Sequence, residues 1–263
     1  MIYIKDRIRI LSSGQLKELL CLHRKHKDDI AIYVEDGYLS LFRDFLHKYP
    51  FILISKDEIK DGYELTSPNI ELSFDSFLSF PSSIRKAIIN DYDYLTEMVR
   101  QNINEHRFNH SLSVAKTARE LAKIHGVDEN KAYLAGLLHD CCKFPDSETN
   151  GVLEEYLKYY DPDKMNGIYG GYHSWVGPYY LKEKLKFHDK DILNAIYNHT
   201  ILNSRDKLSM IVYIADKREP LRNIDDGIID IARKDLHKAY VLLKKDVEDY
   251  IRSNDERFVE NSI

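Results

Sequence analysis

The sequence lacks a basic excess, a long apolar run and a leader-like start. Its 38 Lys and Arg are outnumbered by 43 Asp and Glu, giving a net charge of -5 over 263 residues. That balance offers no footing for sequence-independent nucleic-acid binding, which needs a cationic surface. No stretch approaches the ~20 apolar residues that cross a bilayer, and residues 1–5 do not resemble the start of a secretion signal. We therefore expect a cytoplasmic protein with neither a nucleic-acid nor a membrane partner.

Cysteine is also scarce, and its placement argues against a disulfide framework. The three cysteines are an odd number without spaced pairs. Cys141 and Cys142 are adjacent, and neighbouring side chains on a helix point about 100° apart, so both are poorly placed to bind one ion. We expect them to be small buried side chains.

The most informative feature that is present is the adjacent pair His139-Asp140, which ends the apolar run at residues 132–138. A run that is apolar on nearly every side predicts a buried helix. An imidazole and a carboxylate at its end cost several kcal/mol unless a partner satisfies them, and a metal ion suits both groups.

Four further segments place a His or Asp at the edge of an apolar helical run, at His110, His173, His199 and Asp216. Any one His among the 11 in the chain is more often structural than a ligand, but the ordered set favours metal binding. Four imidazoles and two carboxylates exceed the needs of one ion, and match two metals about 3.5–4 Å apart, bridged by a carboxylate and a hydroxide. Asp140 is the natural bridge. Mixed nitrogen and oxygen ligands suit iron, manganese, cobalt or zinc.

These residues resemble the HD superfamily of metal-dependent phosphohydrolases, and in particular its bacterial symmetrical bis(5'-nucleosyl)-tetraphosphatases. The resemblance covers about residues 94–223. It is carried by five segments in order: Arg107-x-x-His110-Ser111, Ala135-Gly136-Leu137-Leu138-His139-Asp140-x-x-Lys143, His173-Ser174-x-x-Gly177, Ile192-Leu193-Asn194-Ala195-Ile196-x-x-His199-Thr200 and Ala215-Asp216-x-x-Glu219-Pro220-x-Arg222.

The resemblance implies a di-iron enzyme that cuts diadenosine tetraphosphate at its centre and releases two ADP. It implies that metal is held by His110, His139, Asp140, His199 and Asp216, with His173 as a further ligand or a phosphate contact. Asp140 and Lys143 would be the catalytic residues. The candidate phosphate contacts are Arg107, Lys143, Thr200, Arg205 and Arg222, because cationic and hydroxyl groups suit a polyphosphate. Alternatively, Lys143 is a solvated helix end and Arg222 a surface charge.

Two other functions are compatible with this ligand set. One is an HD phosphohydrolase acting on another nucleotide, such as a nucleoside monophosphate or a cyclic dinucleotide. The other is a sensor that binds a nucleotide without cleaving it. The complete ligand set disfavours the sensor, because sensors derived from enzymes commonly lose a ligand.

The first part of the chain has a different pattern, and we expect a mainly α protein with two domains: a small α/β domain at residues 1–90 and the HD helical bundle at residues 91–263. The patterns predict helices at residues 15–25 and 39–47 and strands at residues 30–34, 51–54 and 70–74, with parallel pairing. The segment Pro81-Ser82-Ser83-Ile84-Arg85 resembles part of the nicotinate-nucleotide adenylyltransferases. Their Gly-rich opening is missing, which implies an inactive remnant kept for packing or dimerisation; the alternative is an unrelated extension.

Two further segments of the second domain carry predictions. Residues 145–171 are loop-like, with a short helix near residues 153–157, and their tyrosines could form a lid or simply pack. Residues 228–251 have an amphipathic pattern that predicts one long helix, covering the bundle or forming part of a homodimer seam.

Overall fold

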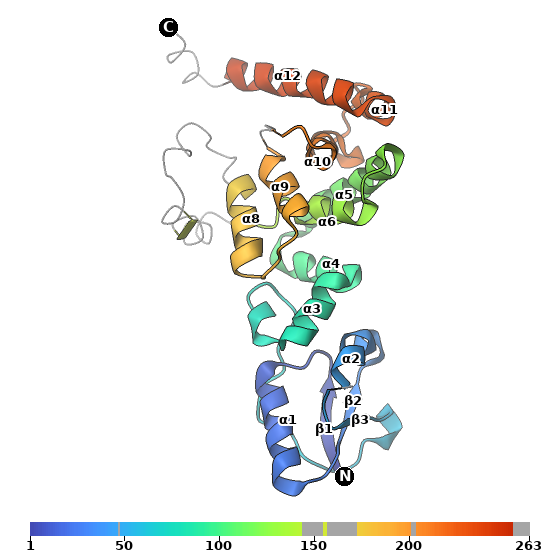
Figure 1. Cartoon of the computed structure of the whole chain (residues 1–263), viewed down its shortest axis with the longest axis vertical. Helices are drawn as coiled ribbons and strands as arrows, with labels where there is room; N and C mark the ends of the chain where they lie inside the picture. Colours follow the sequence, from blue (N-terminus) through green and yellow to red (C-terminus); the bar gives the residue numbers. More distant parts are fainter. Residues whose placement is uncertain (47, 144–154, 157–172, 201–203, 255–263) are drawn as a thin grey trace. The chain divides into compact units, whose positions relative to one another are not determined.

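The computed structural model describes residues 1–46, 48–143, 155–156, 173–200 and 204–254, and the chain divides into two compact units, residues 1–102 and 103–263 (Figure 1). The first unit contains a small sheet with helices, and the second is helical in its described residues. This confirms the predicted mainly α fold with a small α/β part.

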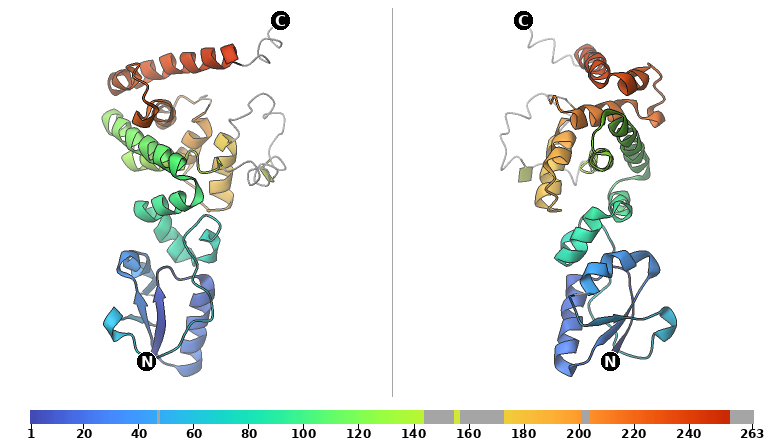
Figure 2. Two further views of the ribbon diagram at one scale, coloured as in Figure 1. Left: turned by 180° about the vertical axis from the view of Figure 1, so that it is seen from behind. Right: turned by 45° about the vertical axis from the view of Figure 1, so that its right-hand side comes forward.

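A three-stranded parallel sheet organises the first unit, in the order β1 (Ile2–Ile8), β2 (Ile30–Val34) and β3 (Phe51–Leu53). Helix α1 (Ser13–His26) connects the first two strands, and α2 (Leu39–Leu46) connects the next two, as parallel pairing requires. Ser12 and Gln15 form a capping box that fixes the start of α1. Helix α1 runs beside the sheet in all three views (Figures 1 and 2).

The predicted strands at residues 30–34 and 51–54 are confirmed, but the third strand was assigned to the wrong segment. It is β1, whose Ile4 and Ile8 are fully buried. Residues 70–74 form no strand. Ser73 and Ser76 instead exchange backbone-to-hydroxyl hydrogen bonds of 2.9 and 3.2 Å, which fold this segment into a turn. Its apolar alternation reflects burial of Leu72 and Phe74 rather than strand pairing.

Two helices complete the first unit, α3 (Ser82–Asn90) and α4 (Tyr92–Asn102). The single residue Asp91 separates them, at the boundary expected between residues 90 and 91. Helix α4 packs on α3, and the Tyr94 hydroxyl donates to the Gly37 carbonyl at 2.5 Å. These contacts place α4 in the first unit, so the division between the units falls after Asn102 rather than after residue 90.

The second unit is a bundle of helices. Helices α5 and α6 pack together, α10 packs against α5, α6 and α9, and α8 packs against α9. Gly136 permits the close approach of α5 and α6, because a Cβ at this position would lie 2.7 Å from Cα of Ala115. The helices are α5 (Glu105–His125), α6 (Glu129–Leu138), α8 (His173–Glu183), α9 (Lys190–Asn198), α10 (Lys207–Arg218), α11 (Ile228–Lys234) and α12 (Leu236–Asn254), with a 3-10 turn, η5 (Pro220–Arg222), after α10.

The single C-terminal helix expected at residues 228–251 is instead two helices, α11 and α12. They are separated at Asp235, which has an extended backbone and a carboxylate that accepts from the Lys238 N–H at 2.9 Å. An Asp that caps the next helix in this way interrupts an otherwise continuous apolar pattern. Helix α12 packs against α10, where the rings of Tyr213 and Tyr240 meet edge to face, so it does cover the bundle.

The predicted lid lies outside the described residues, apart from residues 155 and 156, and so does most of the predicted short helix beside it. Among the described residues, no helix combines the length and the hydropathy of a membrane-spanning segment.

Candidate metal centre

The six predicted ligands come together in the second unit because each stands at or near a helix end. His110 belongs to the first turns of α5, and His139 and Asp140 follow the last residue of α6. The other three lie at the start of α8 (His173), directly after α9 (His199) and in the last turn of α10 (Asp216). Five of the six are almost fully buried, and the side chain of His110 is 13% exposed.

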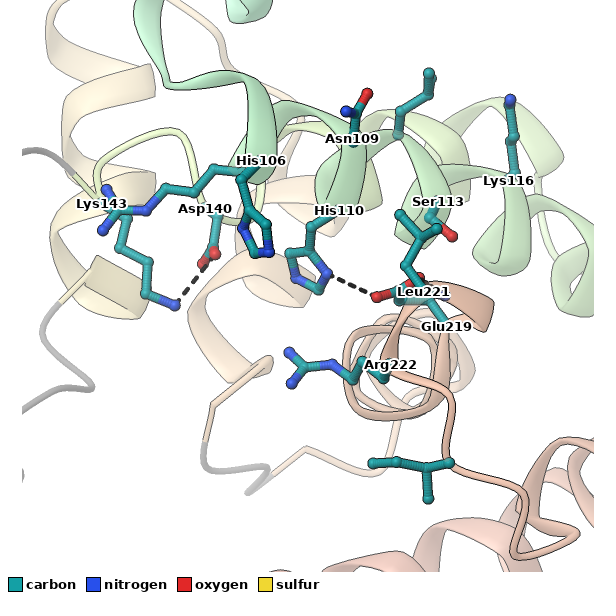
Figure 3. Close-up of a pocket in the computed structure, with 13 residues that line it drawn as sticks. His106, Asn109, His110, Ser113, Lys116, Asp140, Lys143, Glu219, Leu221 and Arg222 are labelled. Carbon is teal, nitrogen blue, oxygen red and sulfur yellow. Dashed lines mark hydrogen bonds and ion pairs between the residues drawn. The ribbon is translucent and has the colours of Figure 1, made fainter.

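Three of the histidines are held in one orientation through Nδ1. In His139 and His199 the Nδ1–H donates to the carbonyl three residues earlier, Gly136 O at 2.7 Å and Ile196 O at 2.6 Å. In His110 the Nδ1–H donates to Glu219 Oε1 at 3.1 Å (Figure 3). A metal-binding histidine is commonly held through its other ring nitrogen in this way, which leaves Nε2 to coordinate.

The two carboxylates share a second pattern, with a lysine on Oδ2 and histidines on Oδ1. Asp140 Oδ2 lies 3.2 Å from Lys143 Nζ, and Asp216 Oδ2 lies 2.5 Å from Lys217 Nζ. The lysines offset part of the desolvation cost of the two buried charges. One oxygen of each carboxylate therefore remains directed at the imidazoles.

The directed atoms form overlapping triads that could hold metal. Their donor atoms lie within 4.8 Å of one another in each group: His110, His139 and Asp140; His139, His199 and Asp216; Asp140, His173 and His199. Across the cluster, Asp140 Oδ1 is 3.2 Å from His173 Nε2 and 3.6 Å from His139 Nε2, and Asp216 Oδ1 is 3.2 Å from His110 Nε2.

The unpaired atoms of the cluster fit a metal. Among the described residues, His139 Nε2 and Asp140 Oδ1 are buried and complete no hydrogen bond. Buried polar atoms without a partner are costly, so this arrangement calls for a cation between them. The donor set of imidazole nitrogen and carboxylate oxygen suits divalent transition metals.

The electrostatic environment differs among the members of the cluster. Burial lowers the pKa of His139, but Asp140 and Asp216 outweigh it, so that pKa is raised. Burial raises the pKa of Asp140, but His139, His173 and His199 outweigh it, and the pKa lies well below its ordinary value. Burial, with the neighbouring imidazoles, lowers the pKa of His199 to about 4, against the opposing effect of Asp140. His199 is therefore neutral near pH 7, as a ligand must be. Cys141 and Cys142 are buried, as expected, and burial raises the pKa of the Cys142 thiol.

A cavity of about 980 Å³ opens beside the cluster, and cationic side chains are frequent in its lining (Figure 3). Three of the predicted phosphate contacts, Arg107, Lys143 and Arg222, line it. Arg222 also donates to Asp216 Oδ1 at 3.0 Å. The other two lie elsewhere: the Thr200 hydroxyl is 3.3 Å from His199 Nε2, and Arg205 is exposed and absent from the lining.

Sequence reasoning assigned no role to two supporting residues, although Glu219 belongs to a segment that carries the family resemblance. Glu219, which is 2% exposed, orients His110, and Lys217 pairs with Asp216. Both lie within three residues of Asp216, but their partners could not be inferred from spacing. The only signal was an acidic residue directly before Pro220, at a helix end.

The fold and this cluster define a helical metal-binding domain of the HD type. The HD domain family model matches residues 107–221. A symmetrical bis(5'-nucleosyl)-tetraphosphatase of Halalkalibacterium halodurans is 34% identical over 55% of this chain and 79% of its own length. The counterpart from Bacillus subtilis is 30% identical over 54% of this chain and 78% of its own length. The chain belongs to this family of HD-domain hydrolases.

A longer relative and a solved structure complete the comparison. A Mycoplasma genitalium protein named probable nicotinate-nucleotide adenylyltransferase/Ap4A hydrolase is 31% identical over 78% of this chain, but only 61% of that protein is matched. The match is too long for the second unit alone, so it extends into the first unit. A crystal structure of a predicted HD superfamily hydrolase involved in NAD metabolism, from Clostridium acetobutylicum, aligns with a TM-score of 0.53 and 33% identity, covering 62% of this chain and 88% of that one.

Proposed function

We propose that this protein hydrolyses diadenosine tetraphosphate symmetrically to two ADP. The observation that carries the proposal is the convergence of six His and Asp side chains that could hold metal, beside a cavity with a cationic lining. The relatives named symmetrical bis(5'-nucleosyl)-tetraphosphatase support the choice of substrate.

The six clustered side chains would hold two cations, with Asp140 between them. Its Oδ1 faces three imidazoles, from His139, His173 and His199, which supports the bridging position. When bound, a pair of such cations lowers the pKa of water and neutralises charge on phosphate oxygens. Iron is the metal implied by the family resemblance, and manganese, cobalt or zinc also suit these donors.

The protein's own cations would bind and orient the phosphate chain. Arg107 offers a planar fork that can donate two hydrogen bonds to one phosphate. Lys143 and Arg222 also line the cavity, and each pairs with one of the two carboxylates, Lys143 with Asp140 and Arg222 with Asp216 (Figure 3). A phosphate bound between these groups would lie next to the cluster, because the same side chains contact Asp140 and Asp216.

The test is product identification with purified protein, Mn²⁺ or Fe²⁺ and diadenosine tetraphosphate. We expect ADP as the sole nucleotide product; AMP plus ATP, or no turnover, would contradict the proposal. His139→Ala should remove activity and bound metal together. His237→Ala is the matched control, because His237 is exposed on α12 and outside the cluster. A panel of nucleoside monophosphates and cyclic dinucleotides shows whether another nucleotide is preferred.

A further inference from the structure

The lining of the cavity combines charged and aliphatic side chains. The charged residues include Arg107, Asp140 and Lys143. The aliphatic residues are Leu112, Leu221 and Ile224. Leu221 is 57% exposed and Ile224 is 49% exposed, so neither is covered by the protein's own core.

A proline and hydrogen bonds constrain the backbone of the turn that carries Leu221, although the Leu221 side chain is exposed. Pro220 restricts the backbone at the start of η5, and Glu219 Oε2 accepts from the Leu221 N–H at 2.7 Å. Asn223 closes the turn in the left-handed region, at φ 53°, and its N–H donates to the Pro220 carbonyl. An exposed leucine that the backbone holds in place is suited to contact a ligand, because little conformational entropy is lost when it is covered.

The same glutamate joins this turn to the ligand cluster. Glu219 uses one oxygen for Leu221 and the other for Nδ1 of His110. The backbone of Leu221 is therefore linked to a predicted metal ligand through one buried carboxylate. Lys116 lies across the view from Lys143, with His110 between them, so the cavity extends along α5 away from the Lys143 end (Figure 3).

We propose that Leu112, Leu221 and Ile224 form a subsite for the nucleoside of the substrate, with the base lying against the aliphatic side chains. This inference rests on the proposed function. A nucleoside polyphosphate joins a flat, largely apolar base to an anionic chain, and the lining of the cavity offers aliphatic and cationic side chains that match the two parts. Asn109 and Ser113, also in the lining, offer hydrogen-bonding groups for a sugar or a base edge.

The experiment compares ADP with tripolyphosphate, which carries phosphate charge but no nucleoside. Binding of each is measured by calorimetry to the wild type and to the double variant Leu221→Ser, Ile224→Ser, each loaded with Mn²⁺. We expect the double variant to bind ADP about 10-fold more weakly, which is the loss expected when two aliphatic contacts with the base are removed. Its affinity for tripolyphosphate should not change. Both side chains are half-exposed, so the thermal unfolding midpoint should stay near the wild-type value.

The matched control is Val241→Ser, Leu242→Ser on α12, where the two side chains are 49% and 39% exposed and absent from the cavity lining. This control should bind both probes as the wild type does. Unchanged ADP binding by the variant with both Leu221 and Ile224 replaced would overturn the subsite. An equal loss of affinity for tripolyphosphate would also overturn it. The test needs no turnover. Selective loss of ADP binding in a protein that leaves diadenosine tetraphosphate intact would support the subsite and refute the proposed reaction.

Discussion

Replacing Glu219 by Gln tests whether His110 is held for metal binding by a buried carboxylate. Glu219 accepts two N–H donors, one on each oxygen: Nδ1–H of His110 at 3.1 Å and the backbone N–H of Leu221 at 2.7 Å. A Gln at this position has one oxygen and one NH₂ group, so it can satisfy only one of these donors.

Either orientation of that Gln has a measurable cost. With its oxygen on Leu221, the NH₂ group faces Nδ1 of His110 and favours the tautomer that protonates Nε2, the atom directed at Asp216. With its oxygen on His110, the Leu221 N–H meets a second donor. We expect a 10–100-fold loss of Mn²⁺ affinity, typical when the partner of a metal-bound histidine is removed. One buried, unsatisfied donor should also cost about 1–3 kcal/mol of unfolding free energy.

Affinity is measured by competition with a fluorescent chelator, and stability by thermal unfolding in the presence of excess chelator, so that metal binding does not contribute to it. Glu183→Gln is the control, because the Glu183 side chain on α8 is 43% exposed and, among the described residues, its ion pairs are with Lys182 and Lys186. Wild-type Mn²⁺ affinity in Glu219→Gln would refute the reasoning, even if the variant were less stable.

Two further predictions concern packing and pH. Gly136→Ala should destabilise the protein by about 1–3 kcal/mol, because the added Cβ would meet the Ala115 backbone. Thermal unfolding measures this, and Gly37→Ala is the control, because a Cβ at Gly37 would have no heavy atom within 4 Å. An unchanged or raised unfolding midpoint of Gly136→Ala would exclude the predicted clash. Hydrogen bonds from Thr66, Ser67 and Tyr63 overcome the effect of burial and lower the pKa of Glu18 from 4.5 to about 2. A depressed folded-state pKa contributes stability above the unfolded-state pKa and loses it as pH falls towards 2. Urea unfolding should therefore show Glu18→Gln to be less stable than the wild type by about 1–2 kcal/mol at pH 7, after allowance for solvent exposure, with the gap narrowing below pH 4.5; a gap independent of pH would contradict this.

Part of the fold was predictable because it depends on local pattern. The apolar runs at residues 30–34 and 51–54 became β2 and β3, and crossover helices imposed their parallel pairing. The strand β1 was missed, since an edge position is decided by which neighbour pairs with it. Residues 70–74 alternate like a strand, but Ser73 and Ser76 hydrogen-bond to each other, three residues apart, instead of the segment pairing with a distant strand. The break at Asp235 was also missed, because Asp235 caps the next helix within a continuous apolar pattern.

The sequence by itself determined the chemistry of the candidate site. Six His and Asp side chains stand at or beside apolar runs, where burial of a polar or charged group costs free energy. The sequence alone shows these positions, so it indicates that the side chains have a partner. Only the tertiary structure decided which atoms face one another. The pairing of His110 with Glu219 joins residues 109 positions apart, and the Nδ1 hydrogen bonds that direct the imidazoles depend on backbone geometry at helix ends. The cavity, whose lining combines charged and aliphatic groups, also arises from packing, since α5 and η5 meet only after the chain has folded.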